Sequence, residues 1–383
     1  MENRLNLVRH TGFACLLAAL ALGTLAAPGA ALAQTRTAAQ PRIAITDVRG
    51  RTVKVPRNAS RLLIDDGRFL IALALIHPDP ASVVVGWPRD INRIGTHAYN
   101  QLRTRFPAIE RIAQTSSSAG TFSLEKALSV NPDVAVFTAG TGPSEEQVRV
   151  LEKAGIPVVF IDFIGRPFTN LEPSLRILGQ LTGRQARAEQ FIELRNSRLA
   201  LIEERLKANP RAGRPKVFFE AHAGISEECC NSPGKGSIGD YITFVGGHNI
   251  GADVLPGHTG RLNLEYVLSQ DPAVYIATGG PHLEKAGGLV VGPGFTPAQA
   301  RSSLVRMTQR QGISMLSAVR RGRVHGIAHQ LLNSPLDILA IEALAKWIHP
   351  TLFSDLDPQA TLKEINQHFL VVPLEGTNWI NLR

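Results

Sequence analysis

Side chains suited to binding a small polar molecule recur in the loops that follow apolar, β-branched segments of this 383-residue sequence. Arginine pairs with anionic oxygens through its planar fork, hydroxyl groups add donors, and aromatic rings offer flat contact surfaces. Residues of these kinds, with an aspartate and three histidines among them, are Asp66, Arg68, Trp87, Arg89, Ser117, Ser118, Thr121, Thr141, Phe163, Arg166, His222, His282 and His329. Together they predict a site for a bulky anionic ligand, although each one taken alone fits an ordinary surface position equally well.

A glycine-rich segment offers a second kind of chemistry. From Gly234 it has the Gly-x-Gly-x-x-Gly spacing of a dinucleotide-binding fingerprint, but that motif directly follows a strand, and the nearest predicted strand ends at 221. We therefore predict a loop whose backbone amides, with Lys235 and Ser237, hold an anion at the start of a helix. A flexible loop that binds nothing is the alternative.

Two adjacent cysteines, Cys229 and Cys230, precede this segment. In an oxidising compartment they can form a vicinal disulfide. Free thiols or a pair of ligands for a soft metal are the alternatives.

Metal and catalytic motifs are weak. The histidines form no HxH or HExxH pattern, and His325 and His329 are the only pair spaced by four residues. A direct metal site needs three or four converging ligands, so we predict neither a metal held by the protein alone nor a covalent cofactor; a bare-metal binder remains an alternative. Ser237 does not lie in a Gly-x-Ser-x-Gly elbow, and we predict that the protein is not an enzyme.

The first 33 residues have the pattern of a secretory signal peptide. Arg4 and Arg9 precede an uncharged run at 12–27, and Ala31-Leu32-Ala33 supplies a small-x-small cleavage signature. We predict cleavage after Ala33 and a soluble periplasmic protein. The net charge of +9 then indicates anionic small molecules or a solvated basic surface, and export argues against nucleic acid as a partner.

Apolar segments and helical patterns alternate along the chain, which predicts an α/β fold with largely parallel sheets. The predicted strands are 61–64, 82–87, 133–138, 157–162, 216–221, 273–278 and 323–328, and the predicted helices between and after them include 69–76, 145–154 and 334–348. A long helical pattern at 171–208, which Thr182-Gly183 can kink or divide, separates the two series. We predict an N-terminal α/β lobe at 41–166, a linking helix at 167–210, a C-terminal α/β lobe at 211–350, and a tail at 351–383 that packs on the lobes.

One unit occurs twice. Segments 122–140 and 262–280 are identical at eight of nineteen positions, and each carries a glutamate, Glu125 or Glu265, near the start of a predicted helix. Thr138 and Thr278 lie at the carboxyl ends of the strands that follow, where open α/β sheets bind ligands. Two such lobes would supply the two walls of one cleft.

Taken in order, several segments resemble the periplasmic substrate-binding proteins of ABC importers for iron–siderophore, haem and cobalamin. They are ITDVRGRTVKVPRNASRLL at 45–63, FSLEKALSVNPDVAV at 122–136, AGIPVVFID at 154–162, LGQLTGR at 178–184 and GGHNIGAD at 246–253. The resemblance implies two lobes, a rigid connecting helix and a ligand between the lobes. It also implies that Glu125 and Glu265 dock against arginines of the permease; the alternative is that both are only favourable helix-start residues.

The resemblance further implies the ligand and the partners. We expect a monomer that carries an Fe(III)–siderophore complex to an ABC permease dimer and its ATPase. Haem is less favoured, because family members that bind it tend to have a tyrosine where this sequence has Ser116-Ser117-Ser118, whereas cobalamin stays open. A periplasmic sensor or adaptor with the same fold is a further alternative.

Overall fold

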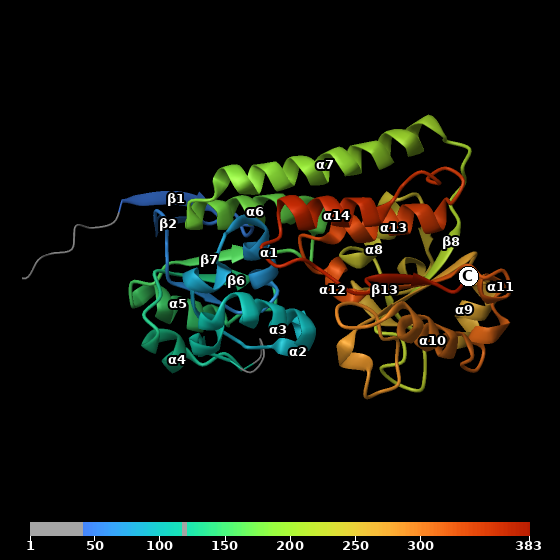
Figure 1. Ribbon diagram of the computed structural model, residues 1–383, viewed down its shortest axis with the longest axis horizontal. Helices are drawn as coiled ribbons and strands as arrows, with labels where there is room; N and C mark the ends of the chain where they lie inside the picture. The colour runs from blue at the N-terminus through green and yellow to red at the C-terminus, as the bar shows by residue number, and fades with distance from the viewer. Residues whose placement is uncertain (1–40, 117–120) are drawn as a thin grey trace, which may run out of the picture. The chain divides into compact units, whose positions relative to one another are not determined.

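The N-terminal lobe is built on a parallel sheet of five strands. The computed structural model describes residues 41–116 and 121–383 (Figure 1). The order of the strands is β5-β4-β3-β6-β7, and all four pairings are parallel. Their bounds are β3 Leu62–Ile64, β4 Val84–Trp87, β5 Ala113–Gln114, β6 Val134–Thr138 and β7 Val158–Ile161. The short apolar runs become central strands because both faces of a parallel sheet are covered; every residue of β3, β6 and β7 is buried.

The C-terminal lobe repeats this plan with an added edge strand. Its order is β10-β8-β12-β13-β14, with β14 antiparallel to β13 and the other pairings parallel. The bounds are β8 Lys216–Glu220, β10 His248–Asn249, β12 Val274–Gly279, β13 Val324–Ala328 and β14 Trp379–Asn381. The tail therefore contributes a strand to the sheet as well as a helix.

The remaining elements surround the two sheets. The helices are α1 Phe69–Ile76, α2 Ile91–Ile94, α3 Thr96–Arg105, α4 Leu124–Ser129, α5 Glu145–Lys153, α6 Pro167–Thr182, α7 Gln185–Ala208, α8 Ile238–Phe244, α9 Leu264–Gln270, α10 Pro297–Thr308, α11 Ser317–Arg320, α12 His329–Leu332, α13 Asp337–Ile348 and α14 Pro358–His368. Two small antiparallel sheets of two strands are formed by β1 Arg42–Thr46 with β2 Thr52–Pro56, and by β9 Asn231–Pro233 with β11 Thr259–Arg261. No described helix is long and apolar enough to cross a membrane.

The linking segment forms two helices instead of one. Gly183 adopts the left-handed conformation, with φ 69°, and ends α6. The chain then turns and α7 packs on α6. Because α7 also contacts α1 in the first lobe and α13 in the second, it is the element that joins the lobes (Figure 1).

The duplicated unit occupies the same place in both lobes. In each copy a short helix, α4 or α9, is followed by a central strand, β6 or β12. That strand lies between an earlier and a later strand of its own lobe, β3 and β7 for β6, and β8 and β13 for β12. The internal repeat of the sequence is therefore a repeat of architecture.

A buried carboxyl group in the helical layer gives a testable pH dependence. Glu342 on α13 is 1% exposed, and its Oε2 has no partner among the described residues. Burial raises the pKa of Glu342 from 4.5 to about 7. The folded state therefore binds more protons than the unfolded chain between these values, so this group's contribution to stability is lost as the pH rises through that range.

We expect Glu342→Gln to remove the loss of stability that deprotonation of Glu342 causes as the pH rises. The variant's free energy of unfolding relative to wild type should rise by on the order of 2 kcal/mol between pH 5 and pH 8. Urea unfolding at the two pH values measures the difference, and the other titrating groups, common to both proteins, cancel. An equal difference at both pH values would show that Glu342 titrates normally.

Candidate ligand site

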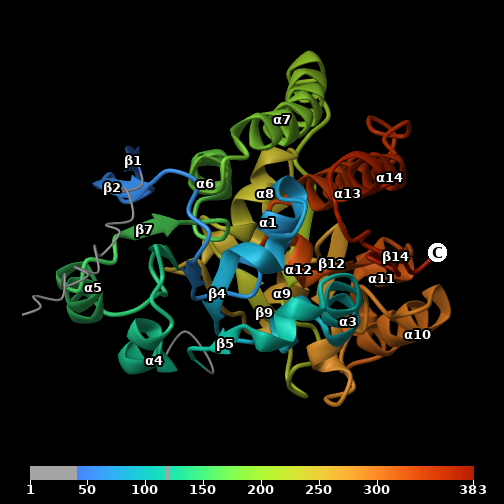
Figure 2. The ribbon, with the colours of Figure 1, turned by 60° about the vertical axis from the view of Figure 1, so that its left-hand side comes forward.

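A pocket of about 460 Å³ lies between the two lobes, within the range typical of small-molecule sites. Its lining residues are Arg68, Arg93, Thr141 and Ile164 from the first lobe and His222, His282, His329, Gln330 and Asn333 from the second. Figures 1 and 2 both show α1, which follows Arg68, near α12, which begins at His329. A second hollow, of about 690 Å³, shares His282 with this pocket.

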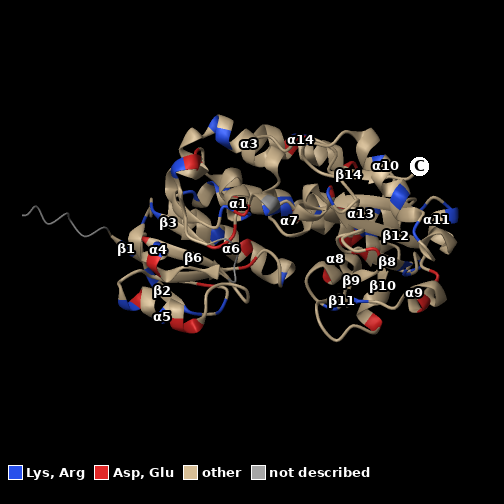
Figure 3. Ribbon diagram, turned by 90° about the horizontal axis from the view of Figure 1, so that it is seen from below, with Lys and Arg blue, Asp and Glu red and all other residues tan. Residues whose placement is uncertain are grey.

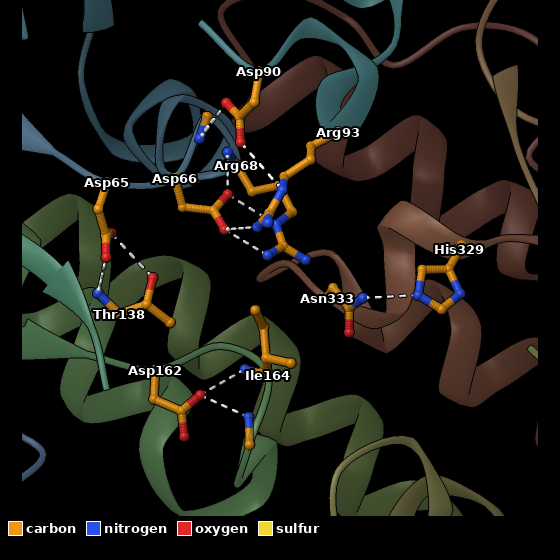
Figure 4. A network of polar contacts seen from close by, with 12 residues as sticks. Asp65, Asp66, Arg68, Asp90, Arg93, Thr138, Asp162, Ile164, His329 and Asn333 are labelled. Atoms are coloured by element: carbon orange, nitrogen blue, oxygen red, sulfur yellow. Dashed lines mark hydrogen bonds and ion pairs between the residues drawn. The ribbon is translucent and has the colours of Figure 1, made fainter. Parts of the chain in front are cut away.

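The first lobe's wall is a paired network of charges (Figure 4). Arg68 donates from Nε to Asp66 Oδ1 at 2.9 Å, and Arg93 donates to Asp66 Oδ2 at 2.7 Å. Arg93 Nε also lies 3.3 Å from Asp90 Oδ2. Burial alone would raise the pKa of Asp66, but the hydrogen bonds and charges of Arg68, with Arg93, hold it below its ordinary value. Two arginines thus face two carboxyl groups, and the wall carries little net charge.

A second aspartate anchors the end of the central strand. Asp65 accepts from the backbone N–H of Thr138 at 2.9 Å and from its hydroxyl at 3.0 Å. Burial raises the pKa of Asp65 to about 7 against these hydrogen bonds. Burial, with the charge of Asp66, also raises the pKa of Asp90 to about 6. Asp65, which follows β3, is therefore bonded to Thr138 at the carboxyl end of β6.

Three histidines form the second lobe's wall. His222 Nδ1 lies 2.8 Å from His282 Nε2, and the His222 ring lies 3.8 Å, centroid to centroid, from that of His329. His329 is held between Thr278 Oγ1 and Asn333 Nδ2, both at 2.9 Å. Burial lowers the pKa of His222 to about 4, with His282 adding to the effect, and burial lowers the pKa of His329 and His282 as well. At neutral pH this wall presents uncharged imidazoles.

Two amide side chains on this wall keep unsatisfied polar atoms. Neither Nε2 nor Oε1 of Gln330, nor Oδ1 of Asn333, has a hydrogen-bond partner within the described residues. Asn333 is 8% exposed. A buried polar atom without a partner is costly, so these groups are candidates to bond a ligand.

The structure brings together five of the predicted ligand residues: Arg68, Thr141, His222, His282 and His329. Asp66 acts behind them by holding the arginines. Arg93, Ile164, Gln330 and Asn333 also line the pocket and were not predicted. For Asn333, the sequence offered one signal. It lies four residues after His329, which directly follows the predicted strand 323–328.

The two predicted aromatic contacts are placed in the core instead. Trp87 is 0% exposed and stacks on Tyr99, and Phe163 is 2% exposed and packs edge-on against Phe69. Both rings point into the lobe because it offers large apolar partners there. Neither has the exposed surface that a ligand contact requires.

Two predicted arginines also lie outside the pocket. Arg89 donates to the backbone oxygens of Glu110 and Ile112, both at 2.9 Å, so it fastens a loop of its own lobe. Arg166 is exposed where α6 begins and does not line the pocket. Of the three arginines predicted to contact the ligand, only Arg68 lines the pocket.

In the glycine-rich loop, the N–H of Gly234 is bonded inside the protein, to the backbone oxygen of His258 at 2.9 Å. The N–H of Gly236 donates to the carboxylate of Asp240, one turn into the same segment, at 3.1 Å. The hydroxyl of Ser237 donates to the backbone oxygen of Ile164 at 2.8 Å, which joins the lobes beside the pocket, and Lys235 is exposed. The amide of Gly236, one of those predicted to hold an anion, is thus already paired with a carboxylate of the protein.

Three further predicted residues, Cys229, Cys230 and Thr121, do not line the pocket. Cys229 and Cys230 are joined by a disulfide. Thr121 is exposed, and it is not among the residues lining the pocket. Ser117 and Ser118 fall outside the described residues.

The paired glutamates are displayed at matched places. Glu125 lies in the first turn of α4, where Ser123 caps the helix by accepting from Lys126 N. Glu265 lies in the first turn of α9, where Asn263 accepts from the N–H of Glu265. Both glutamates are exposed, and neither forms an ion pair with any described residue. Each short helix is capped by its own Ser or Asn, so the glutamates are not needed as caps.

Comparison with known proteins decides the family. The model of the periplasmic binding protein family matches residues 73–331. The chain belongs to this family. The matched region runs from α1 of the first lobe through the linking helices to α12 of the second lobe, and it includes Arg93, Thr141, Ile164, His222, His282, His329 and Gln330 of the pocket.

Three relatives show the range of the similarity. An uncharacterised ABC transporter substrate-binding lipoprotein of Bacillus subtilis, YvrC, is 23% identical over 239 residues, 61% of this chain and 67% of its own. A cobalamin-binding protein of Halobacterium salinarum is 26% identical over 240 residues, 61% of this chain and 60% of its own length. The solved structure of a TroA-like periplasmic binding protein, FepB, from Veillonella parvula has a TM-score of 0.80 and 26% identity over 89% of this chain and 100% of that one.

Proposed function

We propose that this periplasmic binding protein captures a metal chelate of low net charge between its lobes and delivers it to an ABC permease and its ATPase. Members of the family are binding components of transporters and work outside the cytoplasm. The pattern of the first 33 residues supports export of a mature chain that begins at Gln34. The protein would act as a soluble carrier of a small molecule, without catalysis.

The pairing of charge in the pocket carries this proposal. Arg68 and Arg93 are neutralised by Asp66 and Asp90, while the groups left unpartnered, on Gln330 and Asn333, are neutral amides. A highly charged anion would meet no free positive charge on these walls, whereas a neutral chelate rich in amide or hydroxamate oxygens would find donors and acceptors. An iron(III)–siderophore fits this class when its net charge is small.

The relatives support a corrinoid as the other member of the class. The cobalamin-binding protein of Halobacterium salinarum matches this chain over 240 residues, and cobalamin carries peripheral amides that suit Gln330 and Asn333. A bulky ligand of this kind would extend into the neighbouring hollow that shares His282.

A titration panel tests the proposal. The chain from Gln34 onward is titrated calorimetrically with cyanocobalamin, a ferric trihydroxamate, a ferric tricatecholate, haemin and zinc, with the iron-free chelators as controls. Submicromolar binding of a low-charge chelate, with no binding of the metal-free chelators, is the expected result. Binding of zinc alone, or of nothing in the panel, would contradict the proposed function.

Gln330 offers a sharper prediction, because it has no hydrogen bond to lose. We expect Gln330→Leu to leave stability unchanged or higher and to weaken binding of the preferred chelate about tenfold, the effect of 1.4 kcal/mol. Asn209→Leu, at the exposed C-terminal end of α7, is the matched control and should bind as wild type does. Unchanged affinity in Gln330→Leu would mean that its amide faces the small apolar cavity it also lines and not the ligand.

A further inference from the structure

We propose that His222 Nε2 coordinates the metal of the bound complex, so that the pocket selects chelates with an exchangeable coordination position. This inference rests on the proposed function and narrows its substrate class. It follows from the hydrogen bonds in the second lobe, which fix the ring of His222 and occupy both ring nitrogens of His329.

The backbone of His222 is held in an unusual conformation. Its φ is 53°, in the left-handed region that non-glycine residues seldom adopt. The backbone N–H of His222 donates to Thr278 Oγ1 at 2.9 Å, and the next N–H, of Ala223, donates to Thr278 O at 2.9 Å. Such a conformation persists only where the surroundings impose it, often at functional sites. Here the end of β12 fixes the direction in which the His222 side chain leaves the backbone.

The ring of His222 is fixed as well. Its Nδ1 is hydrogen-bonded to His282 Nε2 at 2.8 Å, and one of its faces packs on His329. His329 is unable to act as a metal ligand without losing contacts, because both of its nitrogens are already bonded, to Thr278 and Asn333. His222 Nε2, by contrast, has no hydrogen-bond partner among the described residues, and its ring lines the pocket.

The hydrogen bond to His282 suits metal coordination. When His222 Nδ1–H donates to His282 Nε2, the lone pair of His222 is on Nε2, and a coordinating imidazole that donates its other N–H to a neighbour is the usual arrangement at metal sites. Imidazole is a good ligand for iron and neighbouring transition metals. In the binding step the Nε2 lone pair replaces a weakly held water on the metal, the water leaves to solvent, and no proton is taken up or released.

The part of the chain that the structure describes supplies no complete metal site. No group of three or more His, Cys, Asp or Glu side chains within the described residues is placed to hold a metal ion. A single imidazole therefore adds to a ligand set that the incoming chelate brings with it. This requires a chelate that leaves at least one position open or filled by water.

Two matched pairs of probes test the inference. Aquocobalamin and cyanocobalamin share one ring and differ in having an exchangeable water or a tightly held cyanide on cobalt. A ferric tetradentate dihydroxamate and a ferric hexadentate trihydroxamate differ in the same way on iron. Each is titrated into wild type, His222→Ala, His282→Ala and the exposed control His368→Ala, with affinity and the visible absorption spectrum as readouts.

In at least one pair, the complex with the exchangeable position should bind more tightly than the saturated complex. Its visible absorption band should shift on binding, and that of the saturated complex should not. His222→Ala should abolish the shift and lower affinity about 100-fold, His282→Ala should lower affinity about 10–100-fold, and His368→Ala should match wild type. Equal binding of both members without a spectral shift would overturn the inference and leave the proposed function standing. If no chelate in either pair binds, the inference fails, and failure of the whole earlier panel would overturn the proposed function as well.

Discussion

Arg195→Met should lower the free energy of unfolding by about 3–5 kcal/mol, because it leaves a buried carboxylate without its counter-ion. Arg195 on α7 and Asp337 on α13 have side chains only 1% and 0% exposed, and their two hydrogen bonds are 2.9 and 2.7 Å long. The hydroxyl of Tyr241, on α8, lies 3.2 Å from the same carboxylate. This cluster fastens the joining helix to the second lobe.

A double variant tests whether the lost stability comes from the unpaired carboxylate of Asp337 or from the loss of the ion pair itself. Arg195→Met with Asp337→Leu should recover much of the lost stability, since replacing a buried ion pair by apolar residues of similar size is often neutral. Lys207→Met is the control on the same helix; its ion pair with Glu203 is 70% and 54% exposed, and losing it should cost no more than about 1 kcal/mol. Urea unfolding measures all three, and a cost for Arg195→Met no larger than that for Lys207→Met would contradict the argument.

Reversing both paired glutamates should abolish uptake while leaving ligand affinity unchanged. Glu125→Arg with Glu265→Arg places two positive charges where we propose that the permease presents arginines, and like charges across an interface cost several kcal/mol. Because 1.4 kcal/mol is a factor of ten, transport should fall to less than about a tenth of the wild-type rate. Neither residue lines the pocket, so binding should not change.

The measurement is uptake of the preferred chelate into cells or vesicles that hold the permease and its ATPase, beside a calorimetric titration of each purified variant. Glu146→Arg with Glu204→Arg is the matched control, since these exposed residues lie on α5 and α7 and give the same change in net charge. The control should transport normally. Normal transport by the Glu125 and Glu265 variant would mean that these residues serve only their own helices.

The sequence predicted the fold better than it predicted the site, for a physical reason. Strands and helices follow local patterns, so 69–76 was predicted as a helix and is α1, and the repeated unit became matched elements in two sheets. Strand β14 was missed because three residues at a sheet edge leave little periodicity. The division at Gly183 was foreseen as an option, since glycine supplies the left-handed turn that ends α6.

Site residues depend on partners that are distant in the sequence. Trp87 is the last residue of its strand, where a ligand contact was predicted, but Tyr99 on α3 provides a stacking surface inside the lobe. Arg68 was predicted to contact the ligand from its own position alone, but it shares Asp66 with Arg93, which is 25 residues away in the sequence. The histidines were predicted because each follows a strand of the second lobe, and parallel strands bring their carboxyl ends to one edge.

The charge of the preferred ligand shows whether the pocket is built for a neutral chelate. We would measure the affinities of the mature chain for two ferric chelates of similar size, a neutral hexadentate trihydroxamate and a trianionic tricatecholate, by calorimetry at pH 7.5 and 0.15 M salt. Because Arg68 and Arg93 are already paired, the account predicts at least about tenfold tighter binding of the neutral complex, or 1.4 kcal/mol. Tighter binding of the trianion would contradict it and show that the pocket's arginines leave their carboxylates to meet the ligand.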